Sequence, residues 1–251
     1  MEWYLYIAVI AVGFTAGFIN TLAGGGSAIS LPMLIFLGLP ANVANGTNRI
    51  AIILQNIIAT TGFKKAGVLD FKIGYKLGIV SILGAVLGAL IAVKLNEALI
   101  RAIIGVVLLF MLVLIIFKPD IWIKAQAGKT GSKLSWLSFV IFFIIGAYGG
   151  FIQVGVGFFL LGGLVLHEKL DLVKANAIKV FIILLYTPLA LVVFILQKQV
   201  DYKLGLVLAI GNMLGAWTGS KVAVSWGPKF VRWVLIVSLL GSAIKLFWFS
   251  D

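Results

Sequence analysis

Long apolar stretches, separated by short polar segments, dominate the pattern of the chain. Crossing the hydrocarbon core of a bilayer, about 30 Å thick, takes about 20 helical residues. Segments that reach or approach this length are predicted to be membrane-spanning helices; they lie at 3–22, 50–63, 74–93, 98–117, 136–155, 180–197, 204–220 and 230–249. The pattern therefore predicts an all-α integral membrane protein.

Two further apolar segments, 27–39 and 158–166, are too short to cross a bilayer. The first follows the glycine cluster Gly24–Gly26, and the second follows Gly155 and Gly157. Glycine weakens a helix interior, so each cluster is expected to interrupt the helix that precedes it. We predict that each short segment turns back at the glycines and forms a broken helical hairpin.

The composition agrees with this pattern, since 62% of the residues are hydrophobic and only 11% are charged. A soluble domain of 251 residues cannot bury so much apolar surface. The chain has no cysteine and a single histidine, so neither a cofactor, a metal centre nor an enzymatic activity is expected. The net charge of +12 is interpreted as a signal for membrane orientation rather than for nucleic-acid binding.

The chain repeats itself after about half its length. An Asp-x-Lys-x-Gly motif occurs at 70–74 and again at 201–205, and a Gly-x-x-x-Gly motif occurs at 84–88 and again at 215–219. Both pairs are related by the same shift of 131 residues. A duplication explains this agreement, and the paired glycines are typical of close helix packing in membranes.

The distribution of basic residues predicts how the two halves are oriented. If each glycine-broken unit crossed the membrane once, the two sides would hold 11 and 9 basic residues; if each unit is a hairpin, they hold 14 and 6. Basic residues concentrate on the cytoplasmic side, so the hairpin arrangement is favoured. It makes the halves inverted repeats, each with one hairpin and three transmembrane helices, and places both termini outside. The predicted parts are a first repeat, 1–117, a basic cytoplasmic linker, 118–135, and a second repeat, 136–251.

Interrupted helices in inverted repeats are typical of secondary transporters, which hold their substrate near the membrane midplane. A half-helix that begins at Ser27 would direct its first N–H groups and the positive end of its dipole toward an anion. The residues predicted to bind substrate from the broken segments are Asn20, Gly24, Gly25, Gly26, Ser27, Gln153, Gly155 and Gly157. Close helix packing is the alternative role of these glycines.

Two polar segments that precede long apolar helices complete the predicted site. Their residues are Asn45, Gly46, Thr47, Asn48 and Arg49 in the first half, and Asn176 and Lys179 in the second. The asparagines also suit ordinary N-caps. Arg49 and Lys179 would each cost several kcal/mol if buried unpaired, and a bound anion would offset that cost. The alternative is that both cations extend to the membrane interface.

The acidic residues argue against one form of coupling. All eight fall in predicted loops or at the termini. Coupling to protons or sodium through a buried carboxylate is therefore not expected. The single histidine, His167, is expected to be a solvated loop residue.

The stretch from Gly17 to Ile52, GFINTLAGGGSAISLPMLIFLGLPANVANGTNRIAI, resembles the signature of the TauE/SafE sulfite exporter family. A glycine-rich segment leads to a serine and a Leu-Pro pair, then to a Gly-Leu-Pro turn and an Ala-x-Gly-Thr helix start. The resemblance implies a carrier in the plasma membrane that exports sulfite or a small organosulfonate by alternating access. Its expected partners are a small anion and the lipid bilayer, with a homodimer as one option. A passive anion channel, or a carrier of another small carboxylate or sulfur oxyanion, is the alternative.

Overall fold

The computed structural model describes the backbone of residues 2–117 and 134–248, and the side chains of residues 2–107 and 134–226. Within these ranges the secondary structure is helical, without strands. The helices are α1 (Trp3–Leu22), α2 (Ser27–Phe36), α3 (Ala41–Lys65), α4 (Phe71–Ala92), α5 (Glu97–Phe117), α6 (Trp136–Phe151), α7 (Val156–Gly162), the π-helix η2 (Gly163–His167), α8 (Leu172–Leu196) and α9 (Tyr202–Trp248). All but the last two residues of the predicted linker lie outside the described part of the chain.

The helical bundle has the dimensions and the surface of a membrane protein. Among the residues that the structure describes, α1, α4 and α8 are long and apolar enough to cross a bilayer. The outer face of α4 exposes Ile79, Leu83 and Leu87, which recur every four residues and therefore form one stripe along the helix. Water would not stabilise such a surface, whereas lipid does. The prediction of an all-helical membrane protein is supported.

Helices α3 and α8 begin earlier than the apolar pattern predicts. Asn45 and Asn176 lie one turn inside these helices, and the N-cap positions are occupied by Pro40 and Asp171. The N-cap interpretation of the two asparagines is therefore wrong. Polar residues can continue a helix, because the backbone hydrogen bonds are the same and packing of the remaining turns supplies the stability.

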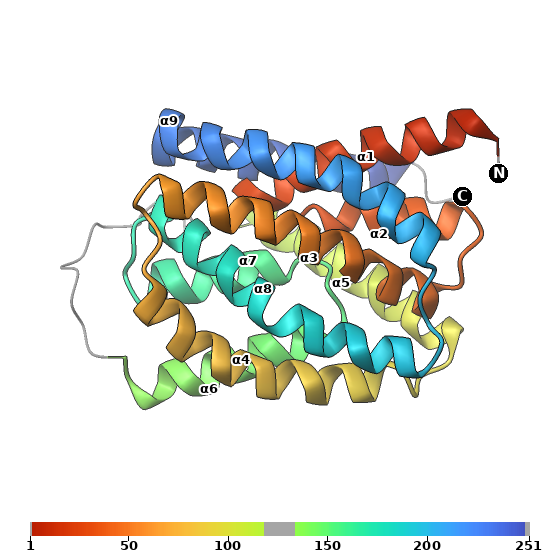
Figure 1. Ribbon diagram of the computed structural model, residues 1–251, viewed down its shortest axis with the longest axis horizontal. Helices are drawn as coiled ribbons and strands as arrows, with labels where there is room; N and C mark the ends of the chain where they lie inside the picture. Colours follow the sequence, from red (N-terminus) through yellow and green to blue (C-terminus); the bar gives the residue numbers. More distant parts are fainter. Residues whose placement is uncertain (1, 118–133, 249–251) are drawn as a thin grey trace.

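Helix α9 covers two segments that were predicted to be separate spans, 204–220 and 230–249. The structure assigns a single helical element from Tyr202 to Trp248. Polar residues such as Lys221 suggested a loop, but they lie within the continuous helical assignment. A straight helix of 47 residues would be about 70 Å long. In Figure 1, α9 turns back, and its later, darker part lies behind its first part.

Both glycine-broken units return toward the end of the bundle from which they start. In Figure 1, α1 runs inward from one end and α2 turns back toward it, while α6 runs inward from the opposite end and α7 turns back. His167 at the end of η2 lies 3.3 Å from Ser135 and 3.2 Å from Ser138, at the start of α6. The two limbs of the second hairpin are thus joined at their base.

Matched helices of the two halves make matched contacts. Helix α1 packs along α9, and α4 packs along α6. The backbones touch at the repeated glycines: a Cβ atom on Gly84 or Gly88 would overlap carbonyl oxygens of α6, and one on Gly215 would overlap a carbonyl oxygen of α1. The prediction that the Gly-x-x-x-Gly motifs mediate close helix packing is confirmed.

Candidate functional site

The two glycine breaks meet inside the bundle. Gly24 and Gly155 have φ angles of 86° and 71°, in the left-handed region that favours glycine. A Cβ atom on Gly24 would overlap the backbone of Gly157, and a Cβ atom on Gly157 would overlap that of Gly24. Close packing therefore explains the absence of side chains at this crossing, and it brings the tips of the two hairpins into direct contact.

Lys179 holds the carbonyl end of α1. Its Nζ donates hydrogen bonds to the carbonyl oxygens of Asn20 (2.9 Å) and Thr21 (3.1 Å) and to Oδ1 of Asn176 (2.7 Å). The last carbonyl groups of a helix lack intrahelical partners and form the negative end of its dipole. A cation at this position stabilises the interrupted helix.

Arg49 holds the carbonyl end of α6 in the same way. Its Nη1 donates to the carbonyl oxygen of Gly149 (3.2 Å) and to Oε1 of Gln153 (3.1 Å), and its Nη2 donates to the carbonyl oxygen of Gly150 (2.6 Å). The guanidinium carbon lies 4.5 Å from the centre of the Phe194 ring, which covers one face of the cation.

The matched asparagines complete these contacts across the two halves. Asn45 of α3 donates from Nδ2 to the carbonyl oxygen of Phe151, and Asn176 of α8 donates to the carbonyl oxygen of Leu22. Each half of the chain thus supplies an asparagine and a cation to the broken helix of the other half. The structure brings together residues that the sequence assigned to one site.

The two cations are buried without a carboxylate partner. Arg49 and Lys179 are both fully buried, so the alternative that they extend to the membrane interface is wrong. The ion pairs found among the described side chains join other residues. Backbone carbonyls offset part of the desolvation cost, but no described carboxylate neutralises either cation. Arg49 also keeps one buried donor, Nε, without a hydrogen-bond partner within the protein.

The second half-helix of the first hairpin is fixed by Asn48. Helix α2 begins at Ser27, as predicted. Asn48 donates from Nδ2 to Oγ of Ser27 (3.2 Å) and accepts at Oδ1 from Oγ of Ser30 (2.8 Å). Neutral hydrogen bonds thus tie the short helix to α3, one residue before Arg49.

Two of the predicted site residues lie elsewhere. Thr47 accepts at Oγ1 from the backbone N–H of Asp201 (2.8 Å), and Gly46 packs against Gln199 and Phe194. Both residues face the segment between α8 and α9. Their contacts are structural, and the structure does not place them with Asn20, Ser27 or the two cations.

Two further buried side chains, which were not among the predicted site residues, contact the broken helices. Gln55 accepts at Oε1 from Nδ2 of Asn20 (3.2 Å) and of Asn212 (3.1 Å), and Tyr186 accepts from Nε2 of Gln153 (3.3 Å). Gln55 and Tyr186 are separated by 131 residues, the repeat shift, and each contacts the polar residue of the nearest broken helix. Because the two polar residues are separated by the repeat shift, they could have been identified from the sequence as matched site positions.

Several buried polar atoms around these residues have no hydrogen-bond partner within the described protein. They are Nε2 of Gln55, Oδ1 of Asn56, Oγ1 of Thr60 and Oδ1 of Asn212. Buried polar groups are normally satisfied by protein, water or ligand. Three of these atoms belong to α3. The interior face of α3 that carries them is therefore the one best suited to contact water or a polar ligand.

Comparison with known proteins identifies the family. The model of the sulfite exporter TauE/SafE family matches residues 9–246, which is nearly the whole chain. The protein belongs to the TauE/SafE family. No solved structure matches this TauE/SafE chain.

The curated relatives of this TauE/SafE protein are membrane transporters by name. A probable membrane transporter protein from Sinorhizobium sp, ORF9, is 29% identical over 246 residues, which cover 98% of this chain and 94% of the relative. A probable membrane transporter protein from Haemophilus influenzae is 27% identical over 251 residues, which cover 98% and 97%. The probable transporter YfcA of Escherichia coli strain K12 is 29% identical over 241 residues, which cover 94% and 87%.

Proposed function

We propose that this protein exports a small oxyanion, with sulfite or an organosulfonate as the substrate, by alternating access around the two helix breaks. The observation that carries the proposal is the pair of fully buried cations, Arg49 and Lys179, which have no carboxylate partner among the described residues. An anion neutralises this interior charge, whereas a cation would add to it.

The residues around the cations support a defined role for each group. Arg49 presents a planar fork that suits an oxyanion, and its unpartnered Nε is a free donor. The amides of Asn20, Asn45 and Asn176 lie at the same breaks and would supply neutral donors. The helix-end carbonyls accept hydrogen bonds from both cations, and a bound anion would replace part of these contacts.

The arrangement of the helices supports alternating access. We propose that the two halves are inverted repeats in the plasma membrane, with the basic face inside and both termini outside. Helices α1 and α6 run inward from opposite ends of the bundle, and each half contacts the break of the other. Rocking of one repeat against the other around a central site is the motion typical of such transporters.

Binding of sulfite to the purified protein in detergent tests the proposal. We expect Arg49→Gln and Lys179→Met to weaken sulfite affinity by about 10-fold or more, because each removes one charge from the site. Arg101→Gln is the matched control, since Arg101 is exposed and pairs with Glu97 at 2.7 Å. Unchanged sulfite affinity in both folded variants would show that the cations do not bind substrate. If Arg49→Gln does not fold, Arg49→Lys takes its place in the binding assay, because lysine keeps the charge but lacks the planar fork.

Transport in liposomes then addresses the substrate and the mechanism. Sulfite, sulfoacetate, taurine, thiosulfate and sulfate would be compared in efflux assays with and without a pH gradient. A carrier is expected to saturate and to be accelerated by substrate on the opposite side. Flux that rises without saturation and shows no such acceleration would instead identify a passive anion channel.

A further inference from the structure

A pocket of about 580 Å³ lies at the end of the bundle where α3 passes into α4 and the second hairpin passes into α8. Its wall includes Asp70 and Phe71 on one side, and Glu168 and Lys174 on the other. Ile178 also lines it, and the next residue, Lys179, holds the end of α1. The pocket therefore reaches the turn of α8 that carries one of the two buried cations.

Glu168 is a buried carboxylate in the wall of this pocket. The residue is only 8% exposed, and its Oε1 atom has no hydrogen-bond partner within the described protein. Its position in a loop is the one predicted, but burial separates it from the other acidic residues. The placement of all acidic residues in loops or at termini did not predict this burial, which arises because neighbouring elements cover the loop.

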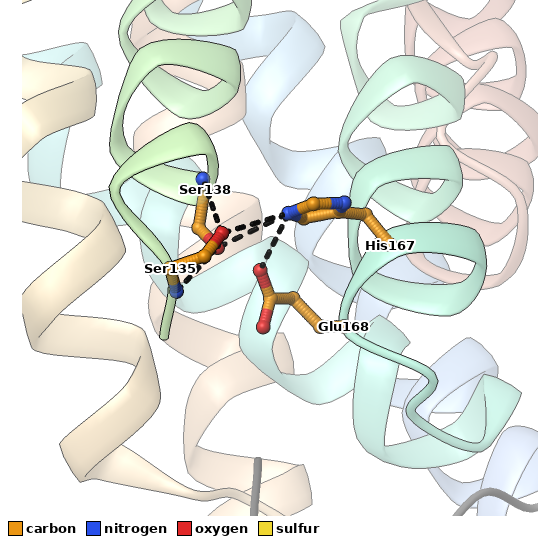
Figure 2. Close-up of polar contacts among 4 residues, drawn as sticks. All are labelled: Ser135, Ser138, His167 and Glu168. Carbon is orange, nitrogen blue, oxygen red and sulfur yellow. Dashed lines mark hydrogen bonds and ion pairs between the residues drawn. The ribbon is translucent and has the colours of Figure 1, made fainter. Parts of the chain in front are cut away.

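The one charged group paired with Glu168 is His167, whose Nε2 lies 3.7 Å from Oε1 of Glu168. The same nitrogen faces the Oγ atoms of Ser135 and Ser138, at 3.3 and 3.2 Å (Figure 2). These two serines form the capping box that begins α6. Contrary to expectation, His167 is not a loop residue, because it ends η2 and its ring joins this helix to the first turn of α6, but its side chain remains 31% exposed.

The other charged groups near Glu168 do not neutralise it. Lys174 on α8 pairs with Asp171 at 3.7 Å, and Asp70 at the start of α4 adds a second acid to the pocket. Lys169, on the same segment, is exposed, and the start of α6 offers hydroxyl groups. Among the described groups, protonation of His167 is thus the direct means of balancing the buried Glu168 carboxylate.

We propose that Glu168 and His167 form a proton-binding site that couples proton movement to transport of the anion; this inference rests on the proposed function. With the proton bound, the imidazolium pairs with the Glu168 carboxylate and donates to a serine hydroxyl, which holds the base of the second hairpin closed. When the proton leaves to the pocket, a negative charge remains beside a neutral ring and the closure weakens. Histidine suits this role because it changes charge near neutral pH.

Proton movement during sulfoacetate transport tests this coupling. Sulfoacetate stays ionised near neutral pH, so proton flux in liposomes with a clamped membrane potential belongs to the protein rather than to the substrate. We expect the wild type to move protons with sulfoacetate, and Glu168→Gln to reduce the ratio of protons to sulfoacetate by about 10-fold, with the remaining transport less dependent on pH between about 5.5 and 8. Glu97→Gln removes an exposed acid and should leave this ratio unchanged. An unaltered ratio in Glu168→Gln would overturn the proposal.

A second measurement does not require transport and separates this inference from the proposed function. The thermal unfolding temperature in detergent would be followed over the same pH range. We expect a pH-dependent change in the wild type that is lost in both Glu168→Gln and His167→Gln, and retained in Glu97→Gln. If both variants keep the wild-type pH dependence, the pair does not bind the proton, whatever the protein transports. If the unfolding temperature of both variants loses its pH dependence but the wild type does not transport sulfoacetate, the proton site is upheld and sulfoacetate is rejected as the substrate.

Discussion

The two broken hairpins share a geometry but differ in chemistry. Each carries a carbonyl end that is held by a cation and an asparagine from the opposite half. At α1 the cation is Lys179, a compact charge whose three hydrogen bonds are all made. At α6 it is Arg49, whose fork leaves one donor unpartnered. The scaffold is thus close to symmetric, while the free binding capacity is concentrated at one of the two breaks.

The difference extends to the bases and interiors of the hairpins. The first hairpin reaches a neutral cluster formed by Asn20, Gln55 and Asn212. The second reaches Tyr186, and its base carries the titratable pair of His167 and Glu168. Duplication therefore preserves backbone positions more strictly than charge. The two hairpins thus differ in the groups that surround them: neutral amides lie beside the first, and a titratable pair lies at the base of the second.

The largest expected effect comes from filling the contact between the hairpin tips. Gly24→Ala adds a Cβ atom that overlaps the backbone of Gly157 and also strains a residue with a φ angle of 86°. We expect it to lower the free energy of unfolding by about 3 kcal/mol or more. Gly38→Ala is the matched control, because Gly38 has a φ angle of 93° but no atom within 4 Å of the added Cβ. A loss of about 1 kcal/mol is expected there. Equal losses, measured by denaturant unfolding in detergent, would mean that strain rather than contact dominates.

A smaller effect is expected from exchanging the cation type at the second break. Arg49→Lys keeps the charge but cannot reach the carbonyl oxygens of both Gly149 and Gly150 while also bonding Gln153 in the same planar geometry. We expect a loss of about 2 kcal/mol in unfolding free energy, as for one or two buried hydrogen bonds, together with weaker sulfite binding. If Arg49→Lys retains full stability and affinity, the two breaks are equivalent and the binding capacity is not concentrated at one of them.

Removing the matched asparagines tests whether the breaks are coupled. Asn45→Ala and Asn176→Ala each free one helix-end carbonyl and should cost about 1 to 2 kcal/mol of unfolding free energy. Because the tips touch at Gly24 and Gly157, the double variant should deviate from additivity by about 0.5 kcal/mol or more. Additive losses in this double-mutant cycle would show that the two breaks respond independently.

The smallest effect is expected outside the bundle interior. Arg101→Gln breaks an exposed ion pair with Glu97, where the two side chains are 60% and 44% accessible. We expect a change of about 0.5 kcal/mol or less in unfolding free energy, and none in sulfite affinity. If Arg101→Gln changed stability or sulfite affinity as much as Arg49→Lys does, the buried arginine would not differ from an exposed one. The candidate site depends on that difference.

The backbone plan could be predicted from the sequence because it depends on local signals. Apolar length located most helices, and the glycines located both breaks, since backbone that turns inside a membrane needs residues without a Cβ atom. Arg49 and Lys179 stood out because charge is rare in such a chain. These signals are present in the residues themselves and need no knowledge of their neighbours.

The predictions that were wrong concern residues whose contacts lie in distant segments of the chain. Asn45 was assigned to a helix start because its polarity resembles a cap, whereas its partner is the carbonyl of Phe151 in the other half. Glu168 was treated as solvated because it lies in a loop, yet packing of the adjacent helices buries it. His167 finds Ser138 only after the second hairpin closes. Burial and partner identity are properties of the fold, so local pattern alone cannot supply them.

The contact of Gly24 with Gly157 has a mechanical consequence. Bare backbone meets bare backbone there, and the Phe158 ring packs beside this contact against Gly25. If the tip of one hairpin moved toward the other, the second tip would have to move away by a similar amount. In the alternating-access motion proposed above, this contact would link opening toward one side of the membrane to closure toward the other.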